Sequence, residues 1–295
     1  MKILFVTTTF ARCAGDPLGG IGNCFYDLLF ELSKYADVDV VAPLTIGSPK
    51  YEKTGNVRIY REPPIKPYGS LESMIKTIQV IKIPIMLRNM YRRIRTLSRL
   101  NKYDVIHGFF IVPAGLLVSA LSAKSIKIVS ALGSDVHTVS HKPFMGVLYR
   151  YIFNHTNGVM YNTPFMKKRL VQLGAQCLEY IPTPINRRIF RLSSVLPKTP
   201  TFVFVGRLTK AKGIEILLKA FTKVLITLPD AKLTIIGDGP EKNDIMKYIS
   251  DNNLHRSIQL TGTLSGVEIS SILRKSYGLL LPSFKEGTPA SVLEA

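Results

Sequence analysis

Two cations and two acids in the last third of the sequence have the types and positions of residues that bind a phosphorylated sugar. Arg207 and Lys212 lie between an apolar run and a helical pattern, where a guanidinium fork and an ammonium can hold a diphosphate. Glu286 and Glu294 stand eight residues apart, and carboxylates accept hydrogen bonds from sugar hydroxyls. This pattern predicts cations at a pyrophosphate and acids on the rings at its two ends. The alternative is that Arg207 and Lys212 are solvated loop residues without a ligand.

A glycine-rich turn near the start of the chain gives a weaker signal for phosphate binding. The segment Gly19-Gly20-Ile21-Gly22 lies between an apolar run and a helical pattern. Glycines let backbone amides approach an anion closely, and a helix N-terminus favours negative charge. Tight strand-to-helix turns also use glycine for steric reasons alone, and the strict G-x-G-x-x-G fingerprint is absent.

The elements that must position these residues follow an alternating order. Short apolar runs alternate with longer helical patterns, which predicts parallel sheets covered by helices on both faces. Predicted strands in the first half are 2–7, 37–42, 57–60, 104–107, 126–130, 158–161 and 177–181. Predicted helices there are 22–34, 74–101, 113–122, 144–153 and 164–173.

A proline-rich stretch without periodicity divides the chain into two domains. It predicts a linker over 183–200, with a first domain over 1–182 and a second over 201–295. In the second domain the predicted strands are 202–205, 232–236, 257–260 and 278–281. The predicted helices are 214–227, 241–252 and 267–275, and a last helix begins near Pro289. The fold class expected is α/β, with two Rossmann-like, doubly wound parallel-sheet domains.

Composition agrees with two buried cores and points to an anionic partner. A length of 295 residues suits about two domains, and 46% of the residues are hydrophobic. The net charge of +19 attracts nucleic acid, anionic lipid or a diphosphate ligand. Among these partners nucleic acid is the least favoured, because the sequence has no recognised nucleic-acid-binding motif and no basic stretch interleaved with stacking aromatics.

Cysteine usage and hydropathy predict a cytoplasmic protein. Three cysteines far apart (Cys13, Cys24 and Cys177) predict reduced, partly buried thiols rather than disulfides or a metal site. The longest apolar stretch, residues 109–123, is too short to span a membrane. The first residues are typical of a buried strand rather than a signal peptide.

The segment from Met74 to Lys102 is basic throughout. It holds eight Lys or Arg and no acid, interleaved with apolar residues. This predicts a basic amphipathic helix, broken or kinked at Pro84. One interpretation is peripheral docking on an anionic membrane surface, and the other is an ordinary solvated helix face with its apolar side in the core.

Several motifs together resemble the group 1 glycosyltransferases, family 4 of the retaining GT-B enzymes. The resemblance lies in Gly206-Arg207-Leu208 with Lys212-Gly213, in Glu286-Gly287 with Leu293-Glu294-Ala295, and in Ile236-Gly237-Asp238-Gly239-Pro240. Weaker similarities lie in Gly19-Gly20-Ile21-Gly22, Asp104-Val105-Ile106-His107 and Gly133-Ser134-Asp135-Val136. The resemblance covers nearly the whole chain. It implies that an acceptor-side first domain and a nucleotide-sugar-binding second domain face a cleft.

The resemblance also implies roles for individual residues. Arg207 and Lys212 bind the donor diphosphate and neutralise the departing nucleotide, and Glu286 contacts the donor hexose as a third catalytic residue. The other donor-binding positions it implies are Gly20, Gly206, Leu264, Gly287, Thr288 and Glu294, with Leu264 beside the base and Glu294 on the ribose. Asp135 and His137 are the candidates on the acceptor side, and the alternative for His137 is an ordinary loop histidine with its hydrogen bonds satisfied. The implied reaction moves a hexose from a nucleotide diphosphate sugar to a glycan or lipid-linked acceptor, with retention, no metal and no further cofactor.

Two departures from the family pattern qualify this reading. Relatives often have His or Arg just before the Gly-Ser-Asp segment, where this chain has Leu132, which leaves the acceptor-side chemistry open. Relatives also continue past the Leu-Glu-Ala motif, so we expect the second domain to be incomplete. An inactive remnant that binds donor without turnover is therefore the alternative function. Among enzymes, an epimerase or a phosphorylase with the GT-B fold is a further alternative, because such enzymes share the cleft.

Overall fold

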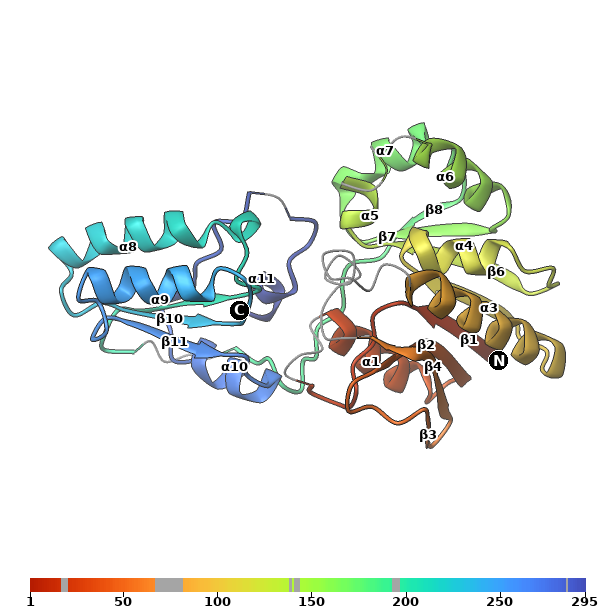
Figure 1. The fold of residues 1–295 in the computed structure, drawn as a ribbon, viewed down its shortest axis with the longest axis horizontal. Coiled ribbons are helices and arrows are strands. Elements are labelled where there is room, and N and C mark those ends of the chain that lie inside the picture. Colours follow the sequence, from red (N-terminus) through yellow and green to blue (C-terminus); the bar gives the residue numbers. More distant parts are fainter. Residues whose placement is uncertain (17–20, 67–81, 138–139, 141–143, 193–196, 285) are drawn as a thin grey trace. The chain divides into compact units, whose positions relative to one another are not determined.

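The chain folds into two α/β units. The computed structural model describes residues 1–16, 21–66, 82–137, 140, 144–192, 197–284 and 286–295. Unit 1 spans Met1–Pro184 and unit 2 spans Ile185–Ala295, and each has its own sheet and helices (Figure 1). Part of the predicted linker packs on unit 2, since the Ser270 hydroxyl donates to the Ile189 carbonyl at 2.7 Å.

Unit 1 is built on an eight-stranded sheet, called sheet A, in the order β3-β4-β2-β1-β5-β6-β7-β8. All its neighbouring strands are parallel except β3 and β4. The strands are β1 (Lys2–Thr7), β2 (Asp37–Thr45), β3 (Tyr51–Thr54), β4 (Val57–Lys66), β5 (Val105–Phe109), β6 (Ile126–Ala131), β7 (Gly158–Tyr161) and β8 (Leu178–Tyr180). The central strands are continuous apolar runs because helices cover both faces.

Alternate residues of β1 belong to different cores. Ile3 and Phe5 pack with the helix α1 (Ile21–Leu32), whereas Leu4 and Val6 pack with α3 (Lys82–Leu100). A third core lies under α6 (Met145–Asn154) and α7 (Lys167–Gln172). The shorter helices among the described residues of unit 1 are η1 (Ile111–Gly115), α4 (Leu116–Ser119), α5 (Ser134–His137) and η3 (Pro164–Met166).

Unit 2 has a four-stranded parallel sheet, called sheet B, in the order β11-β10-β9-β12. Its strands are β9 (Thr201–Val205), β10 (Lys232–Ile236), β11 (Ile258–Gly262) and β12 (Gly278–Leu279). Its helices are η4 (Lys210–Lys212), α8 (Ile214–Thr227), α9 (Lys242–Asp251), α10 (Gly266–Leu273) and α11 (Ala290–Glu294). One apolar core joins Phe204 of β9, Phe221 of α8 and Ile245 of α9.

Each predicted strand has a counterpart in the structure, but several details of the prediction were wrong. The antiparallel edge strand β3 was missed because its four residues are mostly polar and exposed. The structure describes α3 from Lys82, two residues before Pro84, so the predicted break or kink at Pro84 stays a prediction. The predicted positions 74–81 lie outside the described residues. All three cysteines are free, and two of them, Cys13 and Cys177, are exposed rather than partly buried.

Candidate functional site

The clearest candidate site lies in unit 2, where the loops after β9 and β12 pack against each other. Gly213 ends the η4 turn with a φ of +67°, in the left-handed region that favours glycine. A Cβ on Gly213 would lie 2.2 Å from the Pro282 carbonyl oxygen. The amide of Phe284 also donates to the Ala211 carbonyl at 3.0 Å. Glycine is therefore required at position 213 for these two loops to meet.

This contact brings three of the predicted site residues together. The Lys212 ammonium forms an ion pair with the Glu286 carboxylate. The Cε atom of Lys212 lies 4.0 Å from the position that a Cβ would take on Gly206, so the lysine side chain passes over that glycine. The side chains of Lys212 and Glu286 are 25% and 24% exposed, so both remain within reach of a ligand.

A third loop, after β10, supports the turn that carries Gly206. A Cβ on Gly237, whose φ is +142°, would lie 1.9 Å from the Gly206 carbonyl oxygen. The Leu208 amide donates to the Asp238 carbonyl at 3.0 Å. The Gly-Asp-Gly-Pro motif therefore acts through backbone packing that admits only glycine at 237. A glycine motif in a sequence can indicate that another backbone segment approaches closely, but the sequence does not show which segment it is.

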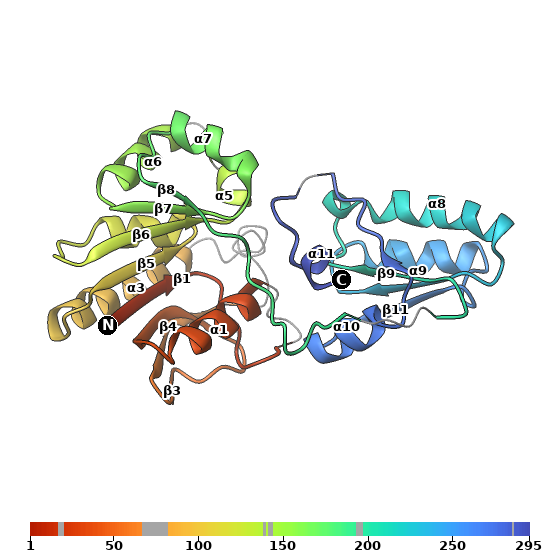
Figure 2. The same ribbon diagram turned by 180° about the vertical axis from the view of Figure 1, so that it is seen from behind.

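The remaining predicted donor residues lie along the same edge of sheet B or after it. Arg207 is exposed in the turn after β9, and Leu264 is partly buried in the turn after β11, just before α10. Gly287 and Thr288 are partly buried between Glu286 and α11. Helix α11 lies at the end of the sheet where the carboxyl ends of its strands point (Figures 1 and 2).

Glu294 differs from the other acids of unit 2. Its side chain is partly buried, and burial raises the pKa of its carboxyl group above the usual value. It makes no hydrogen bond or ion pair to another of the described residues. A partly buried acid without a protein partner is suited to accept hydrogen bonds from a hydroxylated ligand.

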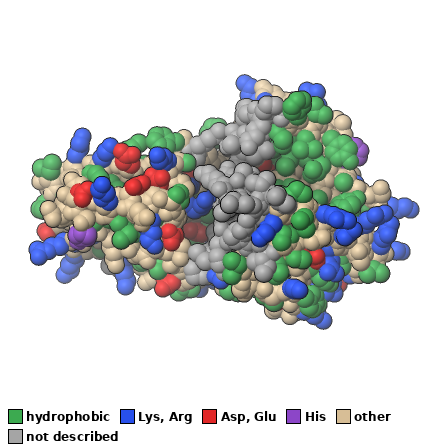
Figure 3. All heavy atoms as spheres, viewed as in Figure 1, with side chains coloured by type: hydrophobic (Ala, Val, Ile, Leu, Met, Phe, Trp, Pro, Cys, Tyr) green, Lys and Arg blue, Asp and Glu red, His purple; other side chains and the backbone are tan. Residues whose placement is uncertain are grey.

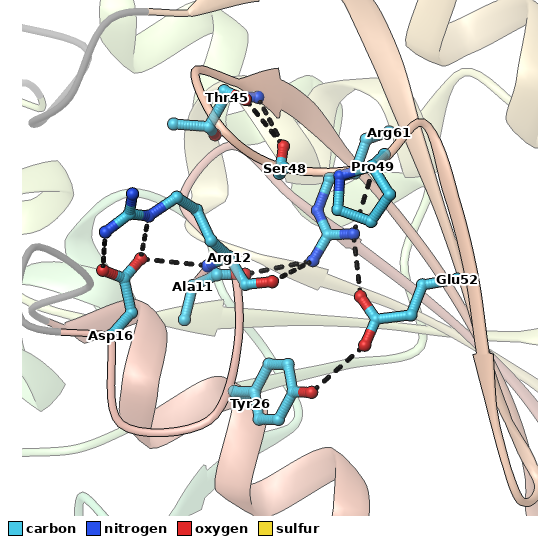
Figure 4. Close-up of polar contacts among 9 residues, drawn as sticks. All are labelled: Ala11, Arg12, Asp16, Tyr26, Thr45, Ser48, Pro49, Glu52 and Arg61. Atoms are coloured by element: carbon cyan, nitrogen blue, oxygen red, sulfur yellow. Dashed lines mark hydrogen bonds and ion pairs between the residues drawn. The ribbon is translucent and has the colours of Figure 1, made fainter.

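In unit 1 the loop between β1 and α1 is held by a buried arginine. The Arg61 side chain, from β4, is 1% exposed and donates to the carbonyls of Ala11 and Arg12 at 3.2 and 3.1 Å. Its other end donates to the Glu52 carboxylate at 3.0 Å, and Glu52 accepts from the Tyr26 hydroxyl (Figure 4). Burial, followed by the charge of Glu52, raises the pKa of Tyr26 to about 12.

The same loop is closed by a second set of contacts. The Arg12 guanidinium binds both carboxylate oxygens of Asp16, and Asn23 of α1 donates to the Asp16 carbonyl at 2.8 Å. A Cβ on Gly22 would lie 2.8 Å from the Ala11 amide nitrogen. The predicted phosphate-binding Gly20 lies outside the described residues, but the chain on both sides of its segment is fixed.

Asp135 is anchored in the interior rather than exposed to a ligand. Its carboxylate is 1% exposed and accepts from the amides of Ile111, Leu132, Gly133 and Val136 at 3.0–3.1 Å. Burial raises its pKa, and these four amides oppose that rise. The acid therefore ties the turn after β5 to the turn after β6. Contact of Asp135 with an acceptor stays a prediction.

The other acceptor-side residues of the sequence analysis are less informative. The His137 side chain lies outside the described residues, although its backbone ends α5. Leu132 is partly buried and packs against the core of Phe5 and Phe109, so an apolar contact occupies the position where the resemblance leads us to expect His or Arg.

A buried histidine and a strained turn lie at the centre of sheet A. The His107 Nε2 atom lies 2.7 Å from the Ser130 hydroxyl, and burial lowers the pKa of His107 to about 4. Just after β5, Phe110 has a φ of +73°, which is uncommon outside glycine and is a feature of functional or tightly constrained turns. The Asp135 carboxylate holds the next amide, that of Ile111, in place.

Metal-ligand clusters and membrane-spanning helices are both absent from the part of the chain that the structure describes. Within the described ranges, no group of three or more His, Cys, Asp or Glu side chains comes together as metal ligands do. None of the described helices is long and apolar enough to cross a membrane.

Comparison with known proteins identifies the family. Residues 18–188 match the family described as Glycosyltransferase Family 4, and residues 186–295 match that described as Glycosyl transferases group 1. Sucrose-phosphate synthase from Thermosynechococcus elongatus has a similar structure, with a TM-score of 0.75 and 16% identity, covering 100% of this chain and 78% of that one. The chain belongs to the family 4 glycosyltransferases, and the predicted GT-B fold class of two Rossmann-like units is confirmed.

Two relatives show the range of the family. The sulfoquinovosyl transferase SQD2 of Arabidopsis thaliana is 26% identical over 72% of this chain and 44% of its own length. An Escherichia coli enzyme named UDP-Gal:alpha-D-GlcNAc-diphosphoundecaprenol alpha-1,3-galactosyltransferase is 32% identical over 44% of this chain and 34% of its own length. The chain thus spans less than half the length of these two curated relatives.

Proposed function

We propose that this chain transfers a hexose from a nucleoside diphosphate sugar to a glycan or lipid-linked acceptor, with retention of the anomeric configuration. The observation that carries the proposal is the contact of Lys212 with Glu286 beside Gly206. A cation for a diphosphate and an acid for sugar hydroxyls meet there at the carboxyl edge of a parallel sheet, where α/β folds bind ligands.

The chemistry follows from where charge develops. As the glycosidic bond breaks, negative charge grows on the departing diphosphate, and a preorganised ammonium and guanidinium stabilise it. Lys212 and Arg207 have these roles in the proposal. Glu286 accepts hydrogen bonds from the hexose and orients it, while Glu294 accepts from the ribose hydroxyls.

The names of the relatives support the substrate class. The E. coli relative is named for a UDP-linked sugar and for an acceptor on diphosphoundecaprenol. Different sugars occur among the names, including sulfoquinovose and galactose. We therefore assign the donor only as a nucleoside diphosphate hexose.

A panel of nucleoside diphosphate sugars tests the proposal. We expect at least one to raise the melting temperature of the full chain and to be turned over with an added glycan or polyprenyl-phosphate sugar. Lys212→Met should lower kcat by about 10²–10³, as removal of an oxyanion-stabilising group does. The control is Lys219→Met on α8, whose ammonium pairs with Glu215 in solvent. Binding without turnover by the unaltered chain would support the alternative of an inactive remnant.

Retention and metal independence are tested on the same reaction. We expect an α-linked donor to give an α-linked product by NMR, and EDTA to leave the rate unchanged. A β-linked product, or loss of activity in EDTA that Mg²⁺ or Mn²⁺ restores, would contradict these two parts of the proposal.

Helix α3 supports peripheral membrane binding as a second part of the proposal. Arg88, Arg92, Arg95 and Arg99 are exposed and share one face, because their spacing of three and four residues follows the helical repeat. Met86 and Met90 face the core. Lys and Arg side chains gather over this helix (Figure 3), and Leu100 is exposed at its end.

Vesicle sedimentation tests the membrane part. We expect binding to phosphatidylglycerol vesicles and none to phosphatidylcholine vesicles, falling with salt. Arg92→Glu with Arg95→Glu should abolish binding, whereas Lys219→Glu with Lys223→Glu on α8 should not. Equal binding by the two double variants would contradict a role for α3.

A further inference from the structure

The two groups that the proposed function assigns to different parts of the donor are partners of each other. Lys212 holds the diphosphate in the proposal and Glu286 holds the hexose, yet their side chains form one ion pair. We propose that Glu286 competes with the diphosphate for Lys212, and that this competition makes the site select intact nucleotide sugars over free nucleoside diphosphates. The inference rests on the proposed function and concerns the specificity of the same site.

The surrounding backbone keeps the two side chains close. The Phe284 amide, two residues before Glu286, donates to Ala211, the residue before Lys212. Gly213, the residue after Lys212, packs against Pro282 so tightly that a Cβ would clash. Both ends of the pair are therefore anchored, and a diphosphate at Lys212 necessarily lies near the Glu286 carboxylate.

A free nucleoside diphosphate meets an unfavourable charge arrangement at this pair. It takes the ammonium from Glu286 and leaves that carboxylate beside the phosphate oxygens with no cation between them. Both side chains are three-quarters buried, so water screens this repulsion less than at the surface. The terminal phosphate of a free diphosphate also carries more negative charge than the same phosphate esterified to a sugar.

An intact donor removes the conflict because it brings its own partner for the acid. Hexose hydroxyls donate hydrogen bonds to Glu286 as the phosphate takes Lys212, so that both members of the pair exchange partners together. After transfer the hexose leaves and Glu286 pairs with Lys212 again. The free diphosphate then binds more weakly. The same pair thus favours donor binding and product release.

The test compares UDP with UDP-glucose, and GDP with GDP-mannose, by calorimetry on the full chain. In Glu286→Gln we expect the nucleoside diphosphate to bind about two- to fivefold more tightly, the range that breaking one partly exposed charge pair gives. We expect the sugar donor to bind more weakly, so that the ratio of the two dissociation constants changes by at least about tenfold. Glu286→Asp retains the charge and should not tighten binding of the free diphosphate.

Glu215→Gln is the matched control, because it removes the same charge from an exposed Lys–Glu pair of unit 2 and should leave both affinities unchanged. Unchanged or weaker diphosphate binding by a folded Glu286→Gln variant overturns the competition. Equal tightening by Glu215→Gln overturns it too, since net charge would then explain the effect. If the unaltered chain binds none of the four nucleotides, the proposed function itself fails, and the inference fails with it.

Discussion

The polar residues of the two units are used in different ways. In unit 1 two charged side chains, Arg61 and Asp135, are each 1% exposed and hold backbone groups of the loops after β1, β5 and β6. In unit 2 two charged side chains of the loops after β9 and β12, Lys212 and Glu286, are about a quarter exposed and bind each other. Glu294 is partly buried and binds no other described residue.

This difference separates residues that shape loops from residues that are available to a ligand. A buried charge with all its hydrogen bonds made is costly to disturb and has no bonding capacity left to offer. A pair that is a quarter exposed can exchange partners at lower cost than a fully buried one. We therefore expect substitutions in unit 1 to act first on stability and those in unit 2 to act first on binding.

The largest effect on stability is expected for Arg61→Met. The substitution leaves the Glu52 carboxylate without its cation and the Ala11 and Arg12 carbonyls without their donor. Breaking a buried pair from one side costs about 3–5 kcal/mol. Hydrogen–deuterium exchange of the sheet A amides in the full chain measures this loss. Arg92→Met on the exposed face of α3 is the control, and an equal effect of the two variants would contradict the anchoring role.

A slightly smaller loss is expected for Asp135→Ala. Four backbone amides lose their acceptor in the interior, which costs about 3 kcal/mol because each buried donor is left unsatisfied. The comparison variant is Asp230→Ala, whose side chain is exposed in unit 2. Measurement by denaturant unfolding should show a loss for the first variant only. If Asp135→Ala is as stable as the unaltered chain but loses acceptor affinity, the acid has the acceptor role instead.

Burial of His107 makes the stability of unit 1 depend on pH. Because its pKa is lowered to about 4 in the fold from about 6.5 when unfolded, the unfolded chain binds the proton more readily. The contribution of this group to the free energy of unfolding is fully present above pH 6.5. It is lost as the pH falls toward 4, by about 2 kcal/mol between pH 7 and pH 5. Unfolding of His107→Gln should lose most of this slope over that range. His255→Gln, at an exposed turn, should keep it.

The smallest effect on stability is expected for Glu294→Gln. Since burial raises the pKa of this acid, the folded state disfavours its charge, and its contribution to stability declines as pH rises through the titration. Removing the charge at neutral pH should change the unfolding free energy by less than about 0.5 kcal/mol, toward greater stability. Nucleotide binding should nevertheless weaken about tenfold, because one acceptor for the ribose is lost. Unchanged nucleotide affinity would remove Glu294 from the site.

Much of the fold could be predicted because short-range sequence patterns specify it. The β1 and β10 boundaries and the α8 helix were predicted to the residue, since buried parallel strands are continuous apolar runs and helices repeat every 3.6 residues. The edge strand β3 shows no such pattern, because its residues are mostly polar and its formation depends on pairing with β4. The positive φ at Phe110 could likewise not be predicted, because no glycine stands at that position.

The sequence by itself determined the family, the alternation of strands and helices, and which residue types stand after β9 and β12. Only the tertiary structure decided the partners: Lys212 and Glu286 are 74 positions apart, and Asp135 of α5 accepts from the amide of Ile111, which begins η1 after β5. The physical reason is range. Periodicity and turn chemistry act over a few residues, whereas the partner of a charged group depends on how strands cross over and which loops they bring to one edge.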